Sequence, residues 1–121
     1  MMQLLTKIKD QFKAGCLSED EILTTIKTCF NETGYLLDTH TAIGYGVLKQ
    51  YQQETGDHTK TVLLSTASPY KFPESVYQAI YGEELDVYTA IDKLSEKTGV
   101  PVPQALAGIK EREVLHKEAI E

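Results

Sequence analysis

Residues 63–73 read Leu-Leu-Ser-Thr-Ala-Ser-Pro-Tyr-Lys-Phe-Pro, and this stretch decides the interpretation of the fold. Residues 61–64, which lead into it, are apolar or β-branched without alternation, a pattern typical of a strand buried on both faces of a parallel sheet. Pro69 then fixes a turn. Ser65, Thr66 and Ala67 are therefore expected at the carboxyl end of a buried strand, where α/β proteins bind their ligands.

A second polar segment, Asp-Thr-His-Thr-Ala at residues 38–42, is expected to open a helix. Asp38 or Thr39 would cap that helix, whose free amides can hold a phosphate or a carboxylate. His40 would add a hydrogen-bond donor that switches near neutral pH. Capping residues and strand-end hydroxyls are more often purely structural, so the pattern alone leaves both interpretations of these two segments open.

Apolar residues recur at helical spacing along most of the remaining chain. This spacing, together with cap and glycine signals, predicts helices over residues 3–14, from a capping box at 18–21 to Gly34, from about residue 42 to Gly56, and over 74–80, 86–97 and 104–109. Short strands are expected at 35–37 and 61–64. Gly44 and Gly46 in the third helix predict close packing against a neighbour or a ligand.

The alternation of helices with short apolar runs predicts an α/β fold, helix-rich, with a few short and mostly parallel strands flanked by helices. Two or three strands are too few for a self-contained sheet, and the helices carry more apolar surface than those strands could cover. We therefore expect a single domain or fragment, 1–121, with exposed apolar surface and a capacity for self-association. Its parts would be two leading helices (1–33), a strand–helix–strand–helix unit with the site motifs (34–82) and C-terminal helices (83–121).

The composition excludes several classes of protein. Twelve basic and 18 acidic residues give a net charge of −6, which argues against nucleic acid and anionic membranes as partners. Cys16 and Cys29 lack metal-ligand spacing, so no metal is expected, and Cys29 falls near an apolar helix stripe that predicts a buried, reduced thiol. With no visible signal peptide and no long apolar run, a cytoplasmic location is expected.

The two polar segments together resemble the C-terminal part of threonine synthase. Residues 34–42 resemble a segment that in this family usually contains Asp-Pro-His-Thr-Ala, and residues 64–73 resemble its Ser/Gly-Thr-Ala-His-Pro-Ala-Lys-Phe stretch. Two positions depart from the family pattern, because Thr39 stands where proline is common and Ser68 where histidine is common. The resemblance implies a fold-type II pyridoxal phosphate (PLP) enzyme of the tryptophan synthase β-like family.

By that resemblance, Thr66 would contact the pyridine nitrogen of PLP, with Ser65 and Ala67 shaping the cofactor wall. His40, Thr39, Ser68 and Lys71 would lie on the substrate side. The implied activity is that of a carbon–oxygen lyase acting on phosphates in threonine biosynthesis, which converts O-phosphohomoserine and water into threonine and phosphate. PLP would carry the electronic part of the chemistry.

The lysine that holds PLP belongs, in the family, to an upstream segment that we expect this chain to lack. Lys71 is a weak substitute because nothing in its surroundings predicts burial. We therefore expect no catalytic residue here, a missing N-terminal part as partner, and an inactive isolated chain. Two alternatives stay open, a stand-alone small α/β binding module and a subunit that completes an active site held on another chain.

Overall fold

The computed structural model describes residues 1–115, in which the chain forms five α-helices and two short 3-10 helices. These are α1 (Met2–Gln11), α2 (Glu19–Thr33), α3 (Thr39–Thr55), η1 (Pro69–Lys71), α4 (Pro73–Tyr81), α5 (Val87–Thr98) and η2 (Ile109–Glu111). The α-helices confirm five of the predicted helical segments, with shifts of no more than a turn at their ends.

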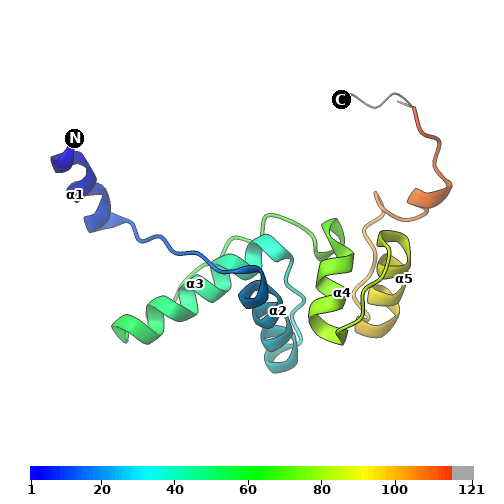
Figure 1. Ribbon diagram of the computed structural model, residues 1–121, viewed down its shortest axis with the longest axis horizontal. Helices are drawn as coiled ribbons and strands as arrows, with labels where there is room; N and C mark the ends of the chain where they lie inside the picture. Colours follow the sequence, from blue (N-terminus) through cyan, green and yellow to red (C-terminus); the bar gives the residue numbers. More distant parts are fainter. Residues whose placement is uncertain (116–121) are drawn as a thin grey trace.

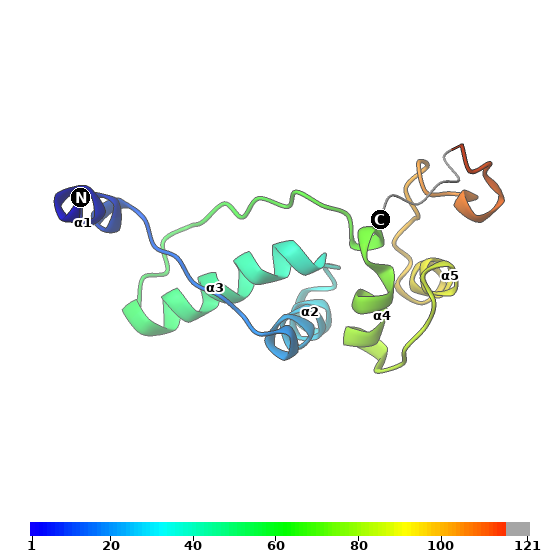
Figure 2. The ribbon, with the colours of Figure 1, turned by 45° about the horizontal axis from the view of Figure 1, so that its top comes forward.

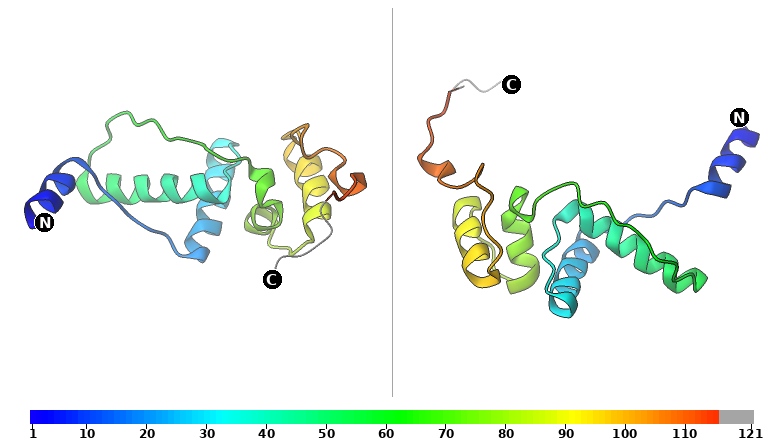
Figure 3. Two further views of the ribbon diagram at one scale, coloured as in Figure 1. Left: turned by 90° about the horizontal axis from the view of Figure 1, so that it is seen from above. Right: turned by 180° about the vertical axis from the view of Figure 1, so that it is seen from behind.

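The molecule is elongated, and its helices lie in the order α1, α3, α2, α4, α5 from one end to the other (Figure 1). α4 packs between α2 and α5, and α3 packs against α2. A long segment without helix or strand, residues 56–68, arches back over α3 and leads into η1 and α4 (Figure 2). Both views in Figure 3 place α1 apart from α2, α4 and α5.

Local capping signals explain where α2 begins and ends. The Ser18 hydroxyl accepts the amide of Glu21 at 3.3 Å, and the Glu21 carboxylate accepts the amide of Ser18 at 2.7 Å, which confirms the predicted capping box. Gly34 ends the helix with a φ of 74°, in the left-handed region that favours glycine.

The core lies around α4. Val76 and Tyr77 of α4, Ile26 of α2 and Leu94 of α5 are fully buried. Removing such a side chain from water contributes about 1.5–3 kcal/mol to folding. Residues 65–72 lead directly into α4. The core around α4 therefore holds the C-terminal end of this segment in place.

The predicted α/β class is wrong for the described part of the chain, because residues 1–115 contain no strand. A strand requires a neighbouring strand to accept and donate backbone hydrogen bonds, and an apolar run cannot reveal whether one is present. At residues 35–37, Leu36 and Leu37 are buried among the helices without such pairing.

The second predicted strand, residues 61–64, is an extended segment beside α3. Only Leu63 is partly buried there, whereas Val62 and Leu64 are 85% and 76% exposed. The predicted burial of this segment on both faces is therefore wrong, because at most one of its faces is partly buried.

The last predicted helix, at residues 104–109, is also wrong. Residues 104–108 form turns, and Gly108 adopts a φ of 69° that ends them before the short η2. An α-helix cannot continue through a left-handed residue. The predicted C-terminal helical part, 83–121, extends beyond the described residues, and its final six positions lie outside them.

Two predictions about single residues are confirmed. Cys29 is buried and Cys16 is exposed, and both thiols are free. Gly44 and Gly46 lie where other segments approach α3 closely, since a β-carbon would lie 2.9 Å from Leu63 Cδ1 at the first position and 2.5 Å from Leu17 Cδ1 at the second.

Candidate functional site at the start of α3 and the segment before α4

Asp38 organises the first turn of α3. One oxygen of its carboxylate accepts the backbone amides of His40 and Thr41, at 2.9 and 3.2 Å, and the other accepts the Thr41 hydroxyl. Asp38 is 3% exposed and Thr41 is also buried. The segment is therefore an N-cap, as predicted, but one that the surrounding chain covers.

The His40 side chain lies beside this cap and remains 55% exposed. Its Nδ1 is 3.6 Å from Asp38 Oδ2 and 3.4 Å from the Thr39 hydroxyl. The imidazole also lies against the ring of Phe72, with ring centroids 5.9 Å apart and planes tilted by 34°. The ring is thus held from two sides and is accessible to a ligand on the rest of its surface.

The structure brings the two polar segments together. Thr41 Oγ1 lies 3.5 Å from Ser65 Oγ, although the two residues are 24 positions apart. The contact between His40 and Phe72 joins the same two segments a second time. A single surface region therefore carries His40, Thr39 and Ser65, which the sequence placed in separate motifs.

Ser68 and its neighbours form the turn into α4. The Ser68 hydroxyl accepts the amide of Tyr70 at 3.2 Å and so caps η1. Tyr70 is buried, and its hydroxyl donates to the carbonyl of Val100 after α5. Lys71 is exposed, with Nζ 5.7 Å from the centre of the Phe72 ring. The turn is thus anchored by Tyr70 and presents Lys71 to solvent.

Thr66 and Ala67 connect Ser65 to this turn. Thr66 is exposed and Ala67 is partly buried. The Thr66 hydroxyl is therefore accessible to a ligand, and Thr66 lies between two contacts with the start of α3, that of Ser65 with Thr41 and that of Phe72 with His40.

Sequence reasoning missed the parts played by Phe72 and by the burial of Asp38. The cap pattern of Asp followed three residues later by Thr occurs at 38–41 and again at 86–89, where Asp86 is exposed. The pattern signals a helix start in both places and carries no information about burial. Phe72 could have been noticed only as an aromatic residue next to a turn.

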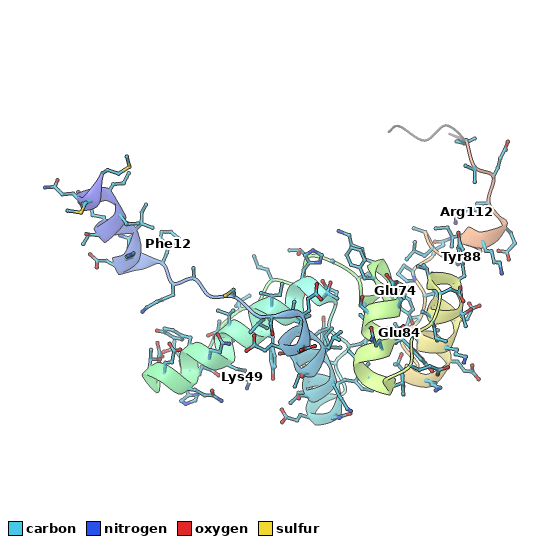
Figure 4. All side chains as sticks on the ribbon, in the orientation of Figure 1. Phe12, Lys49, Glu74, Glu84, Tyr88 and Arg112 are labelled. Atoms are coloured by element: carbon cyan, nitrogen blue, oxygen red, sulfur yellow. The ribbon has the colours of Figure 1, made fainter. Side chains whose placement is uncertain are left out.

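Other parts of the described chain are weaker candidates for a functional site. A groove of about 520 Å³ lies between α2 and α3, where Gly46 and Lys49 are among its lining residues, but it includes none of the predicted cofactor-side or substrate-side residues. Lys49 is labelled in Figure 4. Within residues 1–115, no cluster of three or more His, Cys, Asp or Glu side chains could hold a metal ion. Over the same range, no helix is long and apolar enough to cross a membrane.

Comparison with known proteins points to one family. The family model described as "Threonine synthase, C-terminal" matches residues 41–118. Threonine synthase from Haemophilus influenzae is 40% identical over 82 residues, 66% of this chain, and threonine synthase from Pseudomonas aeruginosa is 33% identical over 81 residues, 67% of this chain. Threonine synthase-like 1 from Mus musculus is 32% identical over 102 residues, 83% of this chain.

A solved structure gives the same result. The crystal structure of PLP-bound threonine synthase from Brucella melitensis matches 90% of this chain at 33% identity, with a TM-score of 0.63. The chain spans 19% of that protein, and 18%, 17% and 13% of the Haemophilus, Pseudomonas and mouse proteins. What these relatives have in common with the chain is thus less than a fifth of their length.

Proposed function

Because the chain belongs to the threonine synthase C-terminal family, we propose that it supplies the C-terminal part of a PLP-dependent threonine synthase. The complete enzyme would convert O-phosphohomoserine and water into threonine and phosphate. The contact between Thr41 and Ser65 carries this proposal, since it joins the two motifs of the family at one place. The lysine that holds PLP would come from the part of the enzyme that this chain does not span.

The residues around position 66 fit one edge of PLP. Ser65 and Thr66 are exposed, and each offers a neutral hydroxyl. A neutral donor suits an unprotonated ring nitrogen, whereas a carboxylate would favour its protonation. Thr66 would donate to the pyridine nitrogen, and Ser65 and Ala67 would line the cofactor wall. When bound, PLP supplies the electron sink for the reaction.

The substrate side would be formed by His40, Thr39, Ser68 and Lys71. O-phosphohomoserine carries phosphate and carboxylate groups, which the exposed Lys71 cation would attract. The hydroxyl oxygen of Ser68 accepts the Tyr70 amide, so its proton is left for an acceptor on a ligand. His40 would hold or move a proton at its ring, and Thr39 lies beside it.

A complementation experiment tests this proposal. The Haemophilus influenzae threonine synthase would be prepared without the region that matches this chain, and the chain would be supplied either fused in its place or as a separate polypeptide. We expect phosphate release from O-phosphohomoserine in the fused form. Activity with the separate polypeptide would identify the chain as a complementing subunit.

The control is a fused enzyme that carries Lys60→Met, a change at an exposed residue of the 56–68 segment that has no role in the proposed site. This control should keep the activity of the fused enzyme. A fused protein that is folded and binds PLP but releases no phosphate would contradict the proposal.

A further inference from the structure

Asp38 is the only charged side chain that is buried among residues 1–115. Burying a carboxylate is costly unless hydrogen bonds compensate for the lost water. Two backbone amides and the Thr41 hydroxyl provide these bonds. An N-cap needs neither this burial nor this number of hydrogen bonds to one carboxylate.

Asp86 shows what capping alone requires. It begins α5 with the same spacing, accepting the amide of Thr89 at 3.1 Å and its hydroxyl at 2.5 Å. Asp86 is exposed, and its capping threonine contacts no other segment through its hydroxyl within the described chain. The Asp38 side chain therefore makes contacts beyond those that capping requires, and Asp86 serves as its matched control.

The first additional contact concerns the His40 ring. The Asp38 carboxylate lies 3.6 Å from Nδ1. Negative charge beside one ring nitrogen attracts the N–H dipole, so the neutral imidazole prefers to carry its proton there. Nε2 is then left as a proton acceptor on a ring that is 55% exposed. Contact with Phe72 limits rotation of the ring.

The second additional contact runs through Thr41. Its hydroxyl is bonded to Asp38 and lies 3.5 Å from Ser65 Oγ. The same carboxylate is thus connected to the proposed substrate side, through His40, and to the proposed cofactor side, through Thr41 and Ser65.

We infer that Asp38 is a positioning residue with two roles. It sets the tautomer of His40 so that Nε2 accepts a proton, and through Thr41 it holds Ser65 in a fixed position relative to His40. The inference rests on the proposed function for the roles of His40 and Ser65. It assigns to His40 the task of a proton acceptor at Nε2 and to Asp38 no contact with the substrate.

The test uses the ¹⁵N-labelled 121-residue chain without PLP. Long-range ¹H–¹⁵N NMR spectra, recorded at a pH of about 9, well above the ordinary pKa of an imidazole, report which nitrogen of His40 carries the proton. His40→Gln identifies its signals among the three histidines. We expect the Nδ1-protonated form in the wild type. Asp38→Asn, which keeps a good N-cap, should shift the signals toward the Nε2-protonated form, and Asp86→Asn should leave them unchanged.

A second variant keeps the inference testable if Asp38→Asn does not fold. Thr41→Val removes the hydroxyl between Asp38 and Ser65, so the Ser65 amide should show a lower order parameter on the picosecond to nanosecond timescale. An Nε2-protonated His40 in the wild type, or the same tautomer in Asp38→Asn as in the wild type, would overturn the inference. So would a Ser65 amide that is equally ordered in Thr41→Val.

Neither measurement depends on PLP or on turnover. A failure here would therefore leave the complementation result standing, and an inactive fused enzyme would leave the tautomer result standing.

Discussion

Gly44 and Gly46 lie two positions apart on α3, and a different segment approaches the helix at each. At Gly44 the neighbour is the tip of Leu63, on the exposed extended segment. At Gly46, which is buried, a β-carbon would meet the Leu17 side chain at 2.5 and 3.3 Å and Thr25 Oγ1 at 3.2 Å. Thr25 is itself held by a hydrogen bond to the Glu21 carbonyl, so it has less room to move.

This difference predicts opposite effects of two alanine substitutions. Alanine in place of glycine in a helix interior gains about 1 kcal/mol, while overpacking costs about 1–3 kcal/mol. Gly44→Ala should raise the urea midpoint because Leu63 can move aside, and Gly46→Ala should lower it. Equilibrium unfolding followed by circular dichroism checks both variants, and a higher midpoint for Gly46→Ala than for Gly44→Ala would refute this account of the packing.

At the scale of elements, the helices could be predicted because their signals are local. Ser18 with Glu21, Asp38 with Thr41 and Asp86 with Thr89 each define a helix start within four residues of sequence. The strands could not be predicted in this way. The sequence of residues 61–64 gives the apolar composition of the segment but does not reveal whether a neighbouring strand is present to pair with it. For the candidate site, the sequence identified the two segments but not the burial of Asp38.

Two of these caps also predict how stability depends on pH. The backbone amide of Ser18 lowers the pKa of the Glu21 carboxyl, and the Thr89 hydroxyl lowers the pKa of the Asp86 carboxyl. The unfolded chain therefore binds more protons, and the stabilisation is present above the unfolded pKa values of about 4 and is lost as pH falls through the lower folded values.

The melting temperature should thus fall between about pH 5 and about pH 3. The double variant Glu21→Gln, Asp86→Asn removes both titrating groups, so its melting temperature should depend less on pH in that range. Melting curves at several pH values provide the measurement. An undiminished slope in the double variant would show that these caps do not contribute to acid sensitivity.

At the scale of the whole molecule, α1 differs from the other helices. All its residues are exposed, including Leu4, Leu5 and Ile8 on one stripe, which the exposed Phe12 directly after the helix extends. Phe12 is labelled in Figure 4. Val62 and Leu64 add exposed apolar surface on the extended segment. The predicted exposed apolar surface is confirmed, whereas self-association stays a prediction.

We expect the 121-residue chain to associate as its concentration rises, because contiguous apolar surface of this kind favours contact between copies. Leu5→Lys combined with Ile8→Lys should reduce the association. Gln3→Lys combined with Thr6→Lys adds the same charge to α1 but keeps its apolar stripe, and serves as the control. Sedimentation equilibrium distinguishes them, and a monomer at every concentration, or equal association of both variants, would contradict this prediction.

We propose that this chain presents the hydroxyl of Thr66 to PLP in a complete threonine synthase. The most direct measurement compares Thr66→Val and Thr66→Ser in the fused enzyme, by phosphate release and by PLP retained after dialysis. Valine keeps the shape and removes one hydrogen bond, which is worth about 0.5–1.5 kcal/mol, and more if it leaves a buried partner unpaired. We predict roughly a ten- to hundredfold loss of turnover and weaker PLP retention for Thr66→Val, and values near the wild type for Thr66→Ser. Wild-type turnover and PLP retention in Thr66→Val would contradict the claim.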